Sequence, residues 1–101
     1  LLLPIVMEYN APAALDKYVT IAKAMSAYTE GMTREEAAKA AVDAVRQLSI
    51  RVGIPQHLAE LGIKETDLPR LAKAAYADVC TPGNPREVTE NDLLELYKKA
   101  Y

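Results

Sequence analysis

The sequence predicts an all-α domain in which about five helices pack as one compact bundle. In several segments apolar residues recur at three- and four-residue spacing, as they do on one face of an α-helix. No segment alternates apolar and polar residues as a half-buried strand does, and no internal repeat is present. The 101 residues suffice for a single domain, residues 1–101, with a small hydrophobic core.

The first two predicted helices cover residues 1–9 and 13–28. Residues 1–9 are apolar on nearly every side, which is typical of a helix that is buried all round or of the end of one. Asn10 and Pro12 interrupt this segment, and Pro12 suits the first turn of the next helix. The second helix is amphipathic, with its apolar face formed by Leu15, Tyr18, Val19, Ala22, Met25 and Ala27.

The third predicted helix runs from Thr33 to about Arg51 and has the clearest signals. Thr33 followed by Glu36 predicts a capping box, in which each side chain accepts a hydrogen bond from the other residue's backbone N–H. Gly53 is suited to the left-handed residue that ends a helix. The apolar face consists of Ala37, Ala38, Ala41, Val42, Val45 and Leu48. Because half of these side chains are alanines, another helix can approach this face closely.

The last two predicted helices cover residues 68–79 and 89–101. Thr66 or Asp67 is expected to cap the first of them, and Thr89, with Asp92 three residues later, the second. The expected packing positions are Leu71, Ala72, Ala75, Tyr76 and Val79 in the first and Leu93, Leu94, Leu96 and Tyr97 in the second.

Composition and charge exclude several classes of function. The net charge of −2 gives no electrostatic reason to expect nucleic acid or an anionic membrane as a partner. The apolar run at the start is far shorter than the roughly 20 residues that cross a bilayer. A single cysteine cannot form an internal disulfide, so nothing points to an oxidising compartment, and we expect a cytoplasmic protein. One histidine and one cysteine are too few for a conventional zinc site.

The chain opens on LLLPIVMEYN, with no initiator Met and no basic residues of a signal peptide. We expect it to be a fragment of a longer protein. A processed N-terminus or a boundary chosen in an experiment is the alternative interpretation.

The stretch DVCTPGNPRE, residues 78–87, is the least helical part of the chain. Cys80 follows a helix, where the negative end of the dipole disfavours a thiolate, so we expect it to line a pocket rather than act as a nucleophile. Asn84 before Pro85 predicts a turn that the Asn84 side chain closes as an Asx turn. Arg86 can bind carboxylates or carbonyls of another segment. Since site residues often lie in loops, this loop is expected to form one wall of a site.

The remaining candidates are weaker. A lone histidine such as His57 is more often a packing or capping residue than a ligand. The segment CTPGNP lacks the lysine of a phosphate-binding loop. From the residues alone, no catalytic group of side chains can be assembled.

In its full length and order the sequence resembles the C-terminal helical domain of the iron-containing (group III) alcohol dehydrogenases. The likeness is strongest to the branch of the lactaldehyde reductases and 1,3-propanediol dehydrogenases. LLLPIVMEYN is similar to the family's LLPHVM-x-[FY]-N, and the strings EGM, VGIP and DLP follow in the family's order. The most specific string is DVCT followed by GNPRE, at residues 78–81 and 83–87.

This resemblance implies the helical part of a two-domain enzyme with a dehydroquinate synthase-like fold. In such enzymes an N-terminal α/β domain binds NAD(P), and the helical domain holds Fe(II) or another divalent metal through one aspartate and three histidines. The metal polarises the oxygen of a small alcohol, diol or aldehyde while the nicotinamide exchanges hydride. The implied partners are that N-terminal domain and further copies in a homo-oligomer.

The family's four metal ligands lie upstream of the matched segment, so the resemblance assigns no metal ligand, cofactor-binding residue or catalytic residue to this chain. His57 matches a family histidine that is not a ligand. The 101-residue chain alone is therefore expected to be inactive and to bind neither metal nor cofactor. Only Cys80 is carried over, as a residue that lines the substrate and nicotinamide pocket.

The sequence departs from the family pattern at two positions. Ile5 replaces a histidine that is not a metal ligand. Pro82 replaces a glycine, fixes φ and removes a backbone donor, so it can reshape the pocket edge and change which alcohol fits.

The alternative function is a non-catalytic helical interaction module. An excised piece of an enzyme would expose apolar surface along residues 1–7 and associate or aggregate. A true module would cover that segment in a monomer or in a closed symmetric assembly.

Overall fold

The computed structural model describes all 101 residues and contains five α-helices and no strand. The helices are α1 (Leu2–Asn10), α2 (Leu15–Ala24), α3 (Arg34–Arg51), α4 (Leu68–Ala77) and α5 (Glu90–Ala100). Short 3-10 turns lie between them, at Ala11–Ala13, Leu58–Leu61, Glu65–Asp67 and Thr81–Gly83. The prediction of an all-α fold with about five helices is confirmed. None of the helices has the length and apolarity that crossing a bilayer requires.

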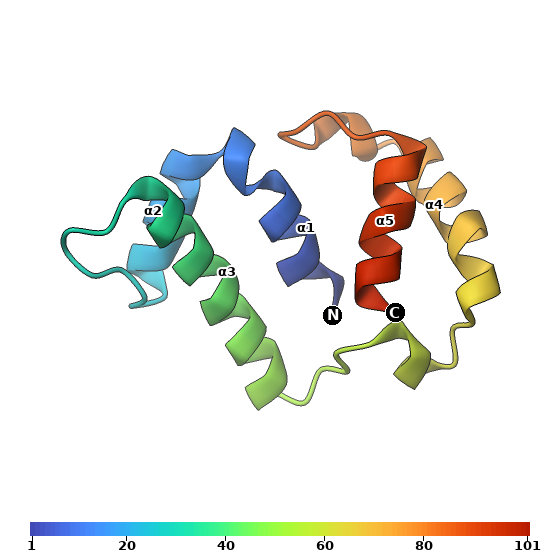
Figure 1. Cartoon of the computed structure of the whole chain (residues 1–101), viewed down its shortest axis with the longest axis horizontal. Coiled ribbons are helices and arrows are strands. Elements are labelled where there is room, and N and C mark those ends of the chain that lie inside the picture. Colours follow the sequence, from blue (N-terminus) through green and yellow to red (C-terminus); the bar gives the residue numbers. More distant parts are fainter.

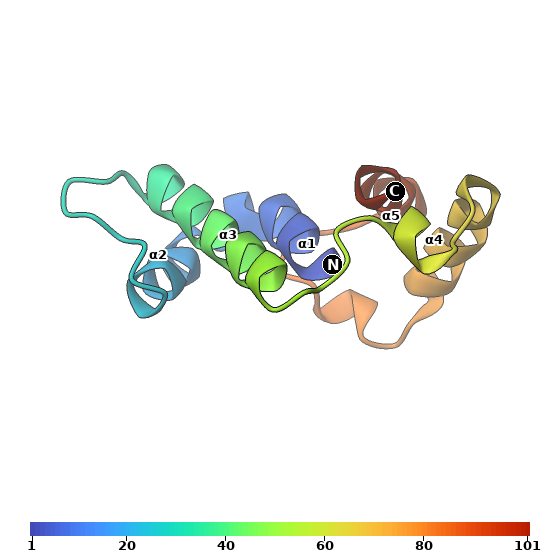
Figure 2. The same cartoon turned by 90° about the horizontal axis from the view of Figure 1, so that it is seen from below.

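The helices form two groups rather than one compact bundle. α2 packs mainly on α3, and α4 packs mainly on α5. α1 lies between the two groups and contacts both α3 and α5 (Figure 1). Figure 2 shows how flat this arrangement is, with extents of 44 × 30 × 18 Å. The radius of gyration, 14.6 Å, exceeds the value of about 13 Å expected for a compact domain of this length.

The hydrophobic core is divided accordingly. Only 14 of 101 residues are buried, and ten of the buried apolar residues form three small clusters. The clusters are Met7, Tyr18, Ala38 and Val42; Ala22, Ala37 and Ala41; and Leu58, Leu68 and Ala100. Ala37, Ala38 and Ala41 of α3 are buried against α1 and α2, which confirms the prediction that this face admits a close helix. Val45 is only partly buried and Leu48 is exposed, because α2 does not reach the last turns of α3.

Two predicted helix boundaries are wrong. The second helix begins at Leu15 because Pro12 lies in a separate 3-10 turn. It ends at Ala24, four residues before the predicted end, because Ser26 adopts a left-handed conformation with φ of 56°. This backbone turn is not visible in the apolar spacing, which continues to Ala27.

The prediction of a cap from Thr66 or Asp67 is also wrong. The carboxylate of Asp67 accepts a hydrogen bond from the backbone N–H of Lys64 at 3.1 Å, and thereby closes a 3-10 turn that runs directly into α4. α4 ends at Ala77, so Val79 lies beyond the helix and is 91% exposed rather than buried. Tyr76 is exposed as well.

The capping box at the start of α3 is confirmed and predicts a measurable stability effect. The Thr33 hydroxyl accepts from the backbone N–H of Glu36 at 3.1 Å, and the Glu36 carboxylate accepts from that of Thr33 at 3.2 Å. Thr33→Ala is expected to lower the free energy of unfolding by about 1 kcal/mol in urea denaturation followed by circular dichroism. The control is Thr66→Ala, because the Thr66 side chain is exposed and caps no helix. This substitution should change the free energy of unfolding by less than about 0.5 kcal/mol. Equal losses in both variants would refute the cap's contribution.

Candidate functional site

The candidate site is built around residues 78–89, which join α4 to α5 and pass the C-terminal end of α1 (Figure 1). A series of backbone hydrogen bonds folds the first half of this loop tightly. The N–H groups of Thr81, Gly83 and Asn84 donate to the carbonyls of residues 78, 80 and 81 at 3.1, 3.0 and 3.0 Å. Pro82 lies in the first positions of this 3-10 turn, where its fixed φ is compatible with the helical backbone.

Asn10 and Asn84 bind each other through their side-chain amides. Asn10 Nδ2 donates to Asn84 Oδ1 at 2.7 Å, and Asn84 Nδ2 donates to Asn10 Oδ1 at 2.8 Å. Asn84 Nδ2 also donates to the carbonyl of Arg86. The prediction that the Asn84 side chain closes an Asx turn is therefore wrong. Its acceptor atom is engaged by a residue 74 positions away, which a local pattern does not reveal.

Arg86 and Tyr9 form a second connection between the loop and α1. Arg86 Nη1 donates to the backbone carbonyl of Tyr9 at 2.9 Å, and the guanidinium lies 4.0 Å from the centre of the Tyr9 ring. The hydroxyl of Tyr9 donates in return to the carbonyl of Glu87 at 2.8 Å. The prediction that Arg86 binds a carbonyl of another segment is confirmed.

The Tyr9 hydroxyl also reaches the start of α5, where it donates to Asp92 Oδ2 at 3.3 Å. Hydrogen bonds from the backbone N–H and the hydroxyl of Thr89 lower the pKa of Asp92 below its usual 3.8. Burial and the neighbouring Asp92 charge raise the pKa of Tyr9 above its usual 10.0. The predicted cap of α5 is confirmed, since Thr89 and Asp92 form a capping box.

The lowered pKa of Asp92 predicts an acid-sensitive cap. Because the folded state holds the charged carboxylate, its stabilisation is fully present above the unfolded-state pKa and is lost as the pH falls below 3.8 through the folded-state value. As the pH is lowered over this range, the stability of Asp92→Asn should therefore fall less than that of the wild type. The measurement is the urea midpoint of each protein at successive pH values. Glu95→Gln, which affects an exposed carboxylate of the same helix, is the matched control. Parallel pH profiles of wild type and Asp92→Asn would contradict the assignment.

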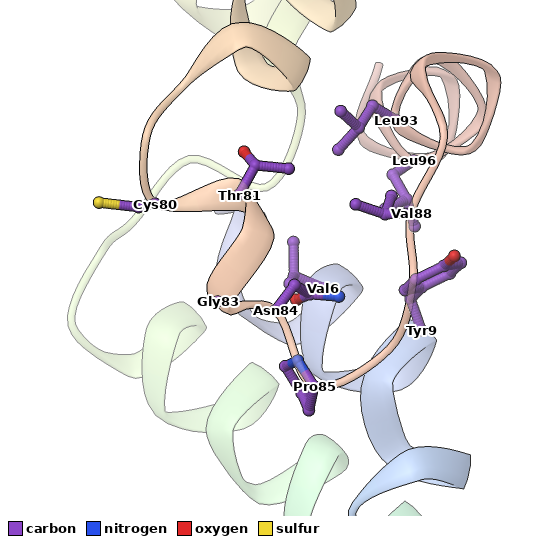
Figure 3. A pocket seen from close by; sticks show the side chains of 10 residues that line it. All are labelled: Val6, Tyr9, Cys80, Thr81, Gly83, Asn84, Pro85, Val88, Leu93 and Leu96. Atoms are coloured by element: carbon purple, nitrogen blue, oxygen red, sulfur yellow. The ribbon is translucent and has the colours of Figure 1, made fainter.

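Beside these contacts lies an open hollow of about 390 Å³ between α1, the loop and α5. Its lining is mainly apolar and consists of Val6, Tyr9, Cys80, Thr81, Gly83, Asn84, Pro85, Val88, Leu93 and Leu96. Figure 3 shows that Cys80 lies at the rim and that its sulfur points away from the other lining side chains. Cys80 is a free, exposed thiol, so its side chain faces outward from this chain.

The other sequence candidates contribute no chemistry here. His57 is exposed at the start of a 3-10 turn, where its backbone N–H donates to Glu60 at 2.9 Å. No group of three or more His, Cys, Asp or Glu side chains comes together as metal ligands would.

Sequence reasoning missed the two α1 residues that hold the loop. In the sequence Asn10 only interrupts an apolar helix, yet in the structure it is the one buried polar side chain and is 6% exposed. A polar amide directly after a helix that apolar residues dominate is a usable signal, because such a group must find a partner. The sequence gives no signal for the role of Tyr9.

The fold and the loop together define a class of protein, namely an all-α domain whose α4–α5 loop is fastened to its first helix beside an open hollow. Comparison with known proteins specifies the family. The model of the Fe-containing alcohol dehydrogenase family, C-terminal, matches residues 1–101, so the chain belongs to this family.

Individual relatives agree with this assignment. The chain is 52% identical to lactaldehyde reductase of Escherichia coli (strain K12) and 40% identical to 1,3-propanediol dehydrogenase of Citrobacter freundii. The match includes 100% of this chain for the reductase and 99% for the dehydrogenase. In both cases the chain spans only 26% of the relative's own length. A crystal structure of 1,3-propanediol oxidoreductase superposes with a TM-score of 0.95 at 39% identity, covering 99% of this chain and 26% of that one.

Proposed function

We propose that the chain is the C-terminal fragment of an iron-dependent alcohol dehydrogenase that interconverts small alcohols or diols and aldehydes with NAD(P). The observation that carries this proposal is the uninterrupted match over all 101 residues, which retains the loop of the candidate site. Relatives named lactaldehyde reductase, 1,3-propanediol dehydrogenase and NAD-dependent methanol dehydrogenase support the substrate class and the cofactor.

In this proposal the chain helps to shape the substrate pocket, while metal and nucleotide are bound by other parts of the enzyme. Its residues do not fit a metal, because no three potential ligands converge, so we derive no metal-dependent step from them. Cys80 is proposed to line the substrate and nicotinamide pocket. Its outward orientation, together with the exposure of Tyr76 and Val79 beside it, supports a loop whose outer side faces the remainder of the enzyme.

The first helix offers a second argument. Leu3 in α1 is 61% exposed and Leu2 is also exposed, as expected for an excised piece of an enzyme that leaves apolar surface along residues 1–7 uncovered. Exposed leucines on a helix that joins the two helical groups support packing against further parts of the same enzyme. The proposed partners are an N-terminal α/β domain of the same polypeptide and other copies in a cytoplasmic homo-oligomer.

The proposal is tested on the full-length protein. The DNA upstream of the Leu1 codon is sequenced, and the complete protein is purified, loaded with Fe(II) and assayed for reduction of lactaldehyde by NADH or NADPH. We expect an upstream reading frame with a nucleotide-binding domain and an Asp and three His ligands, iron in stoichiometric amount and measurable turnover. The 101-residue chain alone should bind no stoichiometric iron. A complete protein without dehydrogenase activity, or without an upstream frame, would refute the proposal and favour an interaction module.

A further inference from the structure

We propose that Asn10 and Asn84 are positioning residues that hold the edge of the substrate pocket, with Tyr9 and Arg86 as a supporting pair. This inference rests on the proposed function and adds to it the residues that fix the loop. The two contacts together are called the α1 latch. The latch acts on Cys80 through residues 78–84, and none of its four members needs to touch the substrate.

Residues 78–84 form one stiff unit. Three successive turn hydrogen bonds link the backbone from Asp78 to Asn84. The carboxylate of Asp78 also accepts from the backbone N–H of Cys80 at 2.8 Å. Pro82 fixes one φ angle inside the unit, and Pro85 fixes another directly after it. A displacement of Asn84 is therefore transmitted along the backbone to Cys80.

The unit is held at two ends. At the α4 end the hydroxyl of Thr81 donates to the carbonyl of Ala75, in the last turn of that helix. At the other end the amide pair with Asn10 fixes Asn84 to the last residue of α1. If the second attachment is lost, the unit can turn about its α4 end and change the position of Cys80.

Polar contacts, rather than burial, order this loop. None of residues 78–89 is buried, so the loop adds no buried side chain to the three core clusters. Ordering such a segment costs conformational entropy, which the amide pair and the Arg86 contacts offset. A loop that contributes no buried side chain, but that polar contacts of Asn84 and Arg86 fasten to Asn10 and Tyr9 of α1, is suited to setting the position of a pocket wall.

The amide pair is sensitive to single substitutions. Asn10 is almost fully buried, and each amide serves as both donor and acceptor for the other. Removing either partner breaks both bonds between the two amides and leaves Asn84 only its local bond to the carbonyl of Arg86, so either single substitution abolishes the contact between the loop and α1. The double variant should then be no worse than the single variants, as is typical of a directly coupled pair.

The test uses the full-length protein loaded with iron and compares Asn10→Ala, Asn84→Ala and the double variant. We expect the KM for lactaldehyde to rise about tenfold in each, which is the effect of losing about one hydrogen-bond contact, while kcat changes less. Asn84→Asp keeps an acceptor for Asn10 and should give an intermediate KM. It also keeps the test informative if an alanine variant fails to fold. Thr33→Ala, whose site lies in α3 away from the loop, is the control for loss of stability alone.

The outcomes separate the latch from the proposed function. An unchanged KM in all Asn10 and Asn84 variants of an active enzyme, or a KM rise of the same size in Thr33→Ala, would overturn the latch and leave the dehydrogenase proposal intact. Fully additive effects of the two alanine substitutions would also overturn it. An inactive wild-type enzyme would refute the proposed function together with the latch.

Discussion

Replacing Leu68 by alanine is expected to lower the free energy of unfolding by about 3 kcal/mol, the largest effect of any single truncation in this chain. Leu68 is 1% exposed and is the only large side chain that is fully buried. It lies in the cluster with Leu58 and Ala100, against which residues of α1, α4 and α5 pack. A cavity at this position therefore weakens the C-terminal helical group and its junction with α1 at once.

The measurement is urea denaturation of Leu68→Ala followed by far-ultraviolet circular dichroism, since the chain has no tryptophan. Leu61→Ala is the matched control, because Leu61 is 59% exposed and its truncation should cost less than about 0.5 kcal/mol. If the two variants lose similar stability, the third cluster is not the core of the C-terminal group.

Replacing Ala41 by leucine is expected to cost about 2 kcal/mol for the opposite reason. Ala41 is 0% exposed and lies with Ala22 and Ala37 in the buried cluster between α2 and α3. A leucine there has no space unless the two helices separate, and separation also weakens the neighbouring cluster around Val42.

The control for this substitution is Ala74→Leu, at an exposed position of α4. Leucine and alanine both favour helices, so this change should alter the urea midpoint only slightly. A tolerated Ala41→Leu with an unchanged midpoint would show that α2 and α3 are not held in close contact by small residues.

Features that depend on neighbouring residues could be predicted from the sequence. Thr33 with Glu36 and Thr89 with Asp92 form the expected capping boxes, and Gly53 has the expected positive φ of 78°. Each of these features involves residues at most four positions apart, so the local pattern contains all the information that is needed.

Features that depend on distant residues could not be predicted in the same way. The partner of Asn84 is Asn10, 74 positions earlier, and the partner of Arg86 is Tyr9, 77 positions earlier. The chemistry of Arg86 was predictable because a guanidinium must bind acceptors, but the identity of its acceptor was not. Val79 was expected in the core because the helical pattern was extended across the true end of α4.

The candidate site was predictable in location and only partly in geometry. The irregular composition of residues 78–87 identified the loop, and the resemblance singled out Cys80. The sulfur of Cys80, directly before the 3-10 turn at Thr81–Gly83, points away from the other lining side chains, and no local sequence pattern specifies this orientation. The role of Cys80 in a pocket stays a prediction.

A chimeric enzyme tests the central claim most directly. The chain replaces the matched C-terminal segment of Escherichia coli lactaldehyde reductase, with the junction at Leu1, and the purified chimera is assayed for lactaldehyde reduction alongside the same enzyme truncated before that segment. We predict that the chimera reduces lactaldehyde and that the truncated enzyme does not. A chimera that folds and holds iron but shows no turnover would contradict the proposal that this chain completes an iron-dependent alcohol dehydrogenase.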